Sequence, residues 1–156
     1  MRARTTSTLG WLLRGAAAGA AGTTALNVVT YLDMALRGRP ASSTPQRTVE
    51  RLAETAHVSI PGEGERRASR VEGLGALTGL VAGVGVGGLF GLARAAGFRA
   101  GTLVTTGTVL VSTNGPMTVL GVTDPRTWSR TDWISDLVPH LAYGLVVTTT
   151  MNAFDR

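Results

Sequence analysis

The chain alternates between long uncharged stretches and segments rich in charged residues. Four stretches contain no Asp, Glu, Lys or Arg: residues 15–32, 73–93, 100–123 and 137–153. They hold 18, 21, 24 and 17 residues, and a helix of about 17 to 25 residues crosses the hydrocarbon core of a bilayer. The pattern predicts an all-α integral membrane bundle, one domain over 1–156, with four transmembrane helices at about 9–35, 71–96, 100–122 and 132–153.

The segment between the first two expected spans, residues 36–70, is polar and carries seven arginines. Thr44 suits the N-cap of a short helix, with Pro45 in its first helical position. Four apolar residues then recur on one helical face: Val49, Leu52, Ala53 and Ala56. This amphipathic helix could lie on lipid headgroups, cover the ends of the spans, bind a partner, or connect two spans with a solvated charged face.

Glycine recurs at every fourth residue of the second expected span. These positions are Gly75, Gly79, Gly83, Gly87 and Gly91, and the first span adds Gly15 and Gly19. An interior glycine costs a helix in water about 1 kcal/mol relative to alanine, whereas in lipid the helix persists because unpaired backbone groups find no water. Small residues at this spacing let another helix approach closely. We expect a glycine packing face, whose partner is either the first span or a second copy of the chain.

The last two expected spans each contain a proline. In the third, Asn114 and Gly115 form a strong hairpin signal, but a lone hairpin cannot satisfy its edges in lipid. We therefore expect a helix that is interrupted or kinked near Pro116, with Asn114 as a candidate functional residue. Pro139 either kinks the fourth helix or begins its membrane part. Three spans would remain if that helix lay in the membrane interface.

The arginines set the expected orientation. The polar loop, together with Arg126 and Arg130, carries more arginines than the opposite side of the membrane. The arginines of that opposite side are Arg2, Arg4, Arg94, Arg99 and Arg156. The positive-inside rule then places the loop in the cytoplasm and both termini outside the plasma membrane.

The N-terminal segment could also be compared with a signal peptide, which begins with basic and small residues. This run, however, continues uncharged to Leu32 without a leucine-rich centre, which favours an uncleaved span.

Composition excludes several classes of function. The chain has no cysteine, so disulfides and sulfur-ligated zinc are ruled out. The net charge of +5 does not indicate nucleic-acid binding, because only 5% of residues are aromatic and stacking platforms are lacking. No hydrolase, zinc-protease, P-loop or dinucleotide signature is present. We therefore expect no enzymatic activity, no cofactor and no metal-binding residue.

A few polar residues within the expected spans are candidates for function. Asp136, His140 and Tyr143 share one helical face, where a carboxylate could orient the imidazole and keep it protonatable. Ionisable groups in a span are functional candidates by default. The alternative is structural, with Asp136 at the helix start and His140 bonded to a neighbouring helix. Asn27 and Asn114 could likewise line a polar path or hold helices together.

Three segments carry a resemblance: RGRPASSTP at 37–45, NGPMTVLGVTDPRTW at 114–128 and DLVPHLAYG at 136–144. Together they resemble a group of uncharacterised small multi-spanning membrane proteins of high-GC actinobacteria. More remotely, residues 132–144 are similar to the closing helix of the YagU-like inner-membrane proteins. The first resemblance implies a multi-spanning membrane fold over most of the chain and no particular activity. The second covers one helix and transfers no function.

These patterns leave three classes of function. The favoured one is a structural or accessory membrane protein that assembles through glycine-mediated contacts, as a homo-oligomer or with another membrane protein. The second is a small proton or ion conductance or transporter component that uses Asp136 and His140. The third is a membrane enzyme.

Overall fold

The computed structural model describes residues 6–155 and is all-α, as predicted, with no strand in that range. Its elements are α1 (Thr8–Arg37), α2 (Thr44–Thr55), α3 (Gly64–Ala95), α4 (Thr102–Val119), the short 3-10 helix η1 (Pro125–Thr127) and α5 (Arg130–Ala153). Arg2, Arg4 and Arg156, which contributed to the expected orientation, lie outside the described residues.

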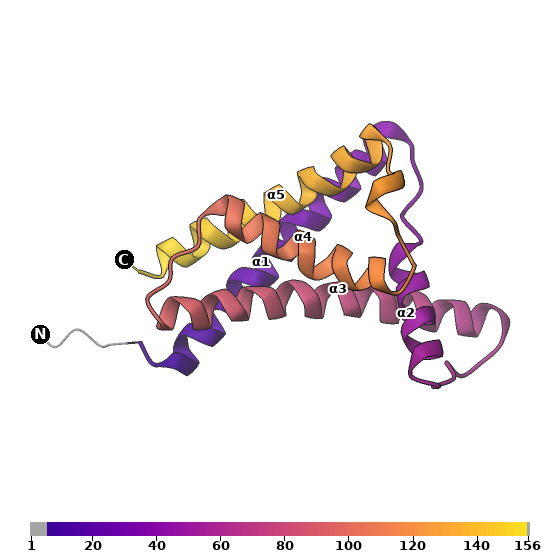
Figure 1. Cartoon of the computed structure of the whole chain (residues 1–156), viewed down its shortest axis with the longest axis horizontal. Coiled ribbons are helices and arrows are strands. Elements are labelled where there is room, and N and C mark those ends of the chain that lie inside the picture. The colour runs from indigo at the N-terminus through magenta and orange to yellow at the C-terminus, as the bar shows by residue number, and fades with distance from the viewer. Residues whose placement is uncertain (1–5, 156) are drawn as a thin grey trace, which may run out of the picture.

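The four long helices form a bundle with two distinct ends (Figure 1). At the terminal end lie both chain termini and the α3–α4 connection, residues 96–101. At the loop end lie α2 and the α4–α5 connection, residues 120–129. α5 packs along α1 and α4, so it belongs to the bundle and does not lie across its end.

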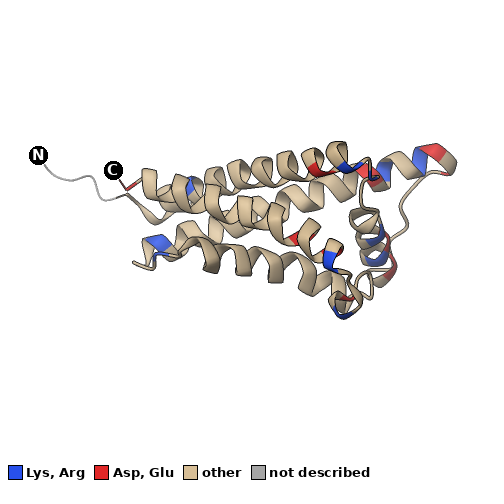
Figure 2. Ribbon diagram, turned by 90° about the horizontal axis from the view of Figure 1, so that it is seen from above, with Lys and Arg blue, Asp and Glu red and all other residues tan. Residues whose placement is uncertain are grey.

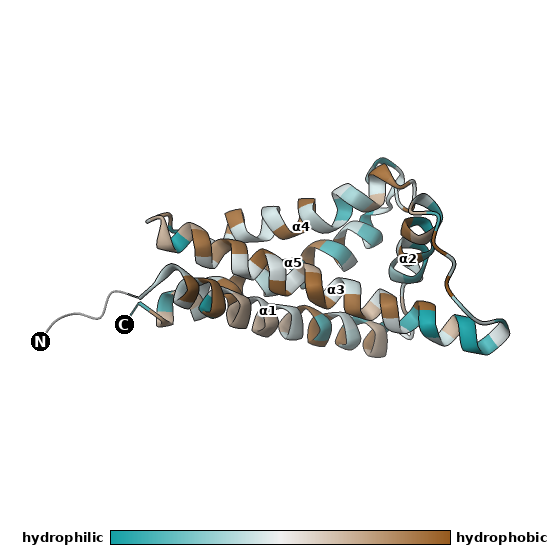
Figure 3. Ribbon diagram, turned by 90° about the horizontal axis from the view of Figure 1, so that it is seen from below, coloured by the Kyte–Doolittle hydropathy of each residue, from teal (hydrophilic) through white to brown (hydrophobic). Residues whose placement is uncertain are grey.

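Charged residues gather at the two ends of the bundle, most densely at the loop end, and the body between them is free of charge (Figure 2). The body carries large apolar side chains on its outer surface, among them Leu77, Val81, Leu103 and Leu145, which are 53–80% exposed. Figure 3 shows this apolar character along α3, whose longest hydrophilic stretch lies at the loop end.

Among the described helices, α3 is the one long and apolar enough to cross a membrane. Its most apolar 18 residues have a mean hydropathy of 1.8, and only 28% of them are buried in the bundle. The other three long helices do not meet the same criterion of length and mean hydropathy, in part because α4 and α5 are rich in threonine. The structure therefore carries one membrane-span candidate by length and composition, where the sequence pattern predicts four.

Glycines bring α1 and α3 into backbone contact. A Cβ on Gly87 would lie 2.5 Å from the Cα of Gly19 and 2.6 Å from its nitrogen. A Cβ on Gly15 would lie 2.7 Å from the Cα of Gly91, and one on Gly19 would lie 2.5 Å from the carbonyl oxygen of Gly83. The partner of the glycine face is thus the first helix of the same chain.

Two of the predicted packing glycines lie outside this contact. No atom lies within 4 Å of a Cβ built on Gly79, and one on Gly75 would meet Pro45 of α2 at 3.1 Å. The reason is helical geometry: four residues turn a helix by 400°, so a row at this spacing rotates by about 40° at each step. The five glycines of α3 therefore cannot all face α1.

Two helix boundaries differ from the sequence-based expectation. α2 begins at Thr44, with Ser43 as its N-cap, one residue before the predicted start. α4 runs without interruption through Asn114 and Pro116 to Val119. The residue before a proline avoids helical conformation mainly because its Cβ meets the ring, and that residue is Gly115. α5 likewise continues through Pro139.

Candidate functional site

A polar cavity of about 620 Å³ lies at the loop end. Residues of α1, α2, α4 and α5 line it, together with the loops on either side. Its position follows from the fold, because α1 and α3 cross at the glycine contact and diverge toward the loop end (Figure 1). The side chains there do not fill the space between the helices.

The floor of the cavity joins α4 to α5 through hydrogen bonds. The side-chain amide nitrogen of Asn114, Nδ2, donates a hydrogen bond to Oδ2 of Asp136 at 2.9 Å. The ring of His140 lies with Nδ1 2.7 Å from the carbonyl oxygen of Asp136 and 3.5 Å from its Oδ1. Nε2 of His140 lies 3.3 Å from the hydroxyl of Thr113. Three predicted site residues, Asn114, Asp136 and His140, are therefore brought together from two helices.

This geometry accommodates both protonation states of His140. Nδ1–H donates to the Asp136 carbonyl, since a carbonyl oxygen can only accept. In the neutral ring the Thr113 hydroxyl donates to Nε2. In the cationic ring Nε2–H donates to Thr113, whose hydroxyl turns to the carbonyl of Val109 at 2.9 Å. A rotation of one hydroxyl is enough to satisfy either state.

An arginine clamp forms the rim of the cavity. Arg37 and Arg39 each bind the carboxylate of Asp33 at 2.6 Å. Arg37 also donates to the hydroxyl of Ser135 on α5 at 2.6 Å, which ties the end of α1 to α5. The sequence analysis missed this clamp. The i,i+4 spacing of Asp33 and Arg37 was a usable signal, whereas nothing in the sequence pointed to Ser135.

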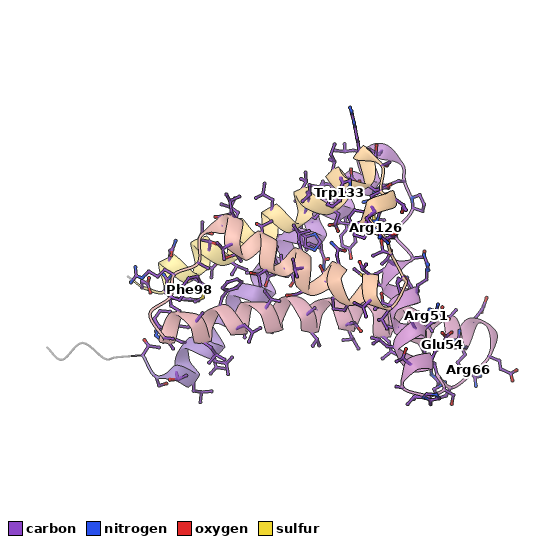
Figure 4. All side chains as sticks on the ribbon, in the orientation of Figure 1. Arg51, Glu54, Arg66, Phe98, Arg126 and Trp133 are labelled. Carbon is purple, nitrogen blue, oxygen red and sulfur yellow. The ribbon has the colours of Figure 1, made fainter. Side chains whose placement is uncertain are left out.

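Several carboxylates outside the cavity at the loop end are paired with arginines. Asp124 binds Arg126 at 2.9 Å, and the hydrogen bonds from Arg126 lower the pKa of that carboxyl. Glu54 of α2 binds Arg51 at 2.9 Å; both point outward from the loop end (Figure 4). Asp136 differs from them, because among the described residues its one ionisable neighbour within 4 Å is His140 and no arginine pairs with it.

The inner end of the cavity is closed by packed side chains. Tyr143 is fully buried and donates a hydrogen bond of 2.6 Å to the carbonyl oxygen of Gly83. Val109 and Val147 are also fully buried and belong to the same core cluster. Tyr143 therefore serves as a core residue and does not line the cavity, in contrast to the predicted relay of Asp136, His140 and Tyr143.

Asn27 also lies apart from the site. It is exposed on α1, whereas the neighbouring Leu26 and Thr30 line the cavity. Asn27 therefore does not join the polar group that the sequence analysis considered, because the turn of α1 points it away from α5. His57 is exposed in the turn that follows α2.

A second polar network closes the terminal end. The guanidinium of Arg94, on α3, is 6% exposed and pairs with Asp155. It also donates to the amide oxygen of Asn152 on α5 at 2.9 Å. This network lies at the other end of the bundle from the cavity, where Arg94 also lines a small pocket together with Val147 and Met151.

Residues 6–155 contain no group of three or more His, Asp or Glu placed to hold a metal ion. No protein-family model, curated protein or solved structure matches this chain.

Proposed function

We propose that the chain is an integral membrane protein with four spans, formed by α1, α3, α4 and α5. The uncharged parts of these helices are 17 to 21 residues long, which corresponds to about 26 to 32 Å of helix. Large apolar side chains cover the outside of the bundle while glycines occupy a central contact. That distribution suits a lipid environment, in which close packing of small residues holds helices together.

We propose further that the loop end faces the cytoplasm and that both termini lie outside the plasma membrane. Nine arginines lie in or beside the loop-end segments, as the positive-inside rule requires. The absence of cysteine makes a direct test simple. A single cysteine at Arg51 should react with a membrane-impermeant maleimide only in inverted vesicles, and one at Phe98 only in intact cells. Labelling of both from the same side would contradict four spans.

The cavity favours a transport function over the alternatives. We propose that the protein is a small proton or ion transporter component in which Asp136 and His140 bind the transported proton or cation. The observation that carries this proposal is a 620 Å³ cavity that reaches both side chains from the loop end, with the buried core cluster around Tyr143 and Val147 deeper in the bundle. A site that opens toward one side and has packed side chains beyond it suits a carrier better than a continuous channel.

Proton flux across proteoliposomes tests this function. Under an imposed pH gradient, wild-type protein should acidify the lumen, and His140→Ala should reduce the rate at least about tenfold, as loss of a proton-transfer group does. His57→Ala is the matched control, because that histidine is exposed and far from the cavity. Equal flux in wild type and His140→Ala, or none in wild type, would contradict the proposal.

An accessory or assembly function is the second candidate. Gly79 and Gly85 lie on the outer surface of α3 with open space around them, so a small-residue face is left for another helix. The glycines that bind α1 are already occupied within the chain, which leaves this candidate with fewer contacts than the sequence pattern suggested.

A further inference from the structure

We propose that the cavity binds an organic ammonium ion, with its charged nitrogen at the carboxylate of Asp136, in exchange for the proton of His140. This inference rests on the proposed transport function and names the class of its substrate.

The charge of the floor favours a cation. Asp136 accepts one hydrogen bond from the neutral amide of Asn114 and lies 3.5 Å from the ring of His140. Its side chain is 20% exposed and lines the cavity. A carboxylate removed from bulk water needs a partner of opposite charge, and no arginine supplies one among the described residues.

The arginines of the rim do not compensate for this charge. Arg37 and Arg39 both bind Asp33 at 2.6 Å, and Arg37 also donates to Ser135. Their guanidinium groups are therefore engaged by protein oxygens at the rim. A positively charged ligand that enters the cavity meets the available carboxylate of Asp136 on the floor. A negatively charged ligand would be repelled by that same carboxylate.

The size and lining of the cavity favour an organic ion over a metal ion. About 620 Å³ lies within the range of pockets that hold small organic molecules. Leu26, Met117 and Pro139 provide apolar surface beside the polar floor. Trp128 also lines the cavity, fixed by an indole hydrogen bond of 2.9 Å to Thr123, and an aromatic face attracts cations.

Protonation of His140 competes with such a ligand. A protonated ring would place a positive charge 3.5 Å from Oδ1 of Asp136, where it neutralises the carboxylate and repels an ammonium group. The other charged groups in or beside the cavity are Asp132 on α5, Asp33 and Arg37 on α1, and Arg39, which follows α1. α4 contains no charged residue, and neither does the part of α3 from 73 to 93. The floor of the cavity therefore holds either the protonated ring of His140 or the ammonium group of a ligand, but not both at once.

Calorimetric titration with benzyltrimethylammonium tests the proposal, because the charge of this probe does not change with pH. The wild-type protein in uncharged detergent should bind it at pH 8, and at least about tenfold more tightly than the neutral 2-phenylethanol or the anionic 3-phenylpropionate, given the strength of a close charge pair. Affinity should fall when the pH is lowered to 5.5, and this fall should be absent in His140→Ala.

Variants localise the binding. Asp136→Asn keeps the shape and the bond from Asn114 but should weaken binding of the probe at least about tenfold. Glu54→Gln is the matched control, because it removes an exposed carboxylate at the same end outside the cavity. The comparison of charged and neutral probes uses wild-type protein, so it holds even if Asp136→Asn fails to fold.

The outcomes separate this inference from the proposed function. No binding of the cation, equal binding of the neutral probe, or preference for the anion would overturn the inference. Proton flux that depends on His140 without binding of the cation would overturn the inference and leave the transport function standing. Binding of the cation without proton flux, when the cation is also supplied in the lumen of the proteoliposomes, would overturn the transport function and leave the ligand class supported.

Discussion

Gly87→Leu is expected to push α1 away from α3 and to lower the free energy of unfolding by about 3 kcal/mol, at the upper end of overpacking effects. The reason is that the first atom of any side chain at this position would lie 2.5 Å from the Cα of Gly19 and 2.6 Å from its nitrogen. Both are backbone atoms, so the contact cannot be relieved by a rotamer change. The helices must separate, or α1 must shift along α3.

The same substitution is expected to alter the cavity, because the crossing of α1 and α3 sets the space between the helices at the loop end. Unfolding of the purified protein in detergent, followed by circular dichroism during denaturant titration, measures the loss of stability. Gly85→Leu is the matched control, since it makes the same change two residues away, where nothing lies within 4 Å. Equal stability of the two variants would show that the glycine contact does not hold the fold.

Tyr143→Ala is expected to lower the free energy of unfolding by about 3 to 5 kcal/mol, as in other removals of a buried aromatic ring. Tyr143 is fully buried among Val109, Val147 and the glycine contact, and its hydroxyl donates to the carbonyl of Gly83. Most of the loss comes from the ring. Tyr143→Phe, which removes only the hydroxyl, should cost about 1 kcal/mol.

The same denaturant titration measures this effect, with Tyr31→Ala as control because Tyr31 is 61% exposed on α1. A loss in Tyr143→Ala no larger than that in Tyr31→Ala would be inconsistent with a packed barrier at the inner end of the cavity. The prediction also bears on transport. Removal of the ring leaves a void beside Gly22, whose Cβ position lies 2.8 Å from Cδ2 of Tyr143, and weakens the seal between the two ends of the bundle.

The positions of the helices were largely readable from the sequence. The uncharged stretches located the four long helices, and Pro45 with the apolar residues after it located α2 to within one residue. These features are local, because charge spacing and helix starts depend on neighbouring residues. The interruption considered near Pro116 is absent for a reason that is also local, since Gly115 lacks the Cβ that would meet the proline ring.

The site was readable in part. The i,i+4 spacing of Asp136 and His140 predicted their proximity on one helix, and the structure adds the direct bond from Asn114 on α4. The spacing of residues could not predict which neighbouring helix the side chain of Tyr143 contacts. Tyr143 lies only three residues from His140, yet it bonds to α3 while His140 faces Thr113 on α4.

An all-α chain with uncharged helices, a polar loop and one acid–histidine pair could be predicted, because each of these depends on the spacing of residues along a single helix. Three other features became visible only in the folded chain: Gly87 faces Gly19 while Gly79 faces outward, Arg37 and Arg39 share Asp33, and a cavity opens over Asp136. These features depend on how helices cross, and a crossing is set by backbone contacts between residues far apart in the chain.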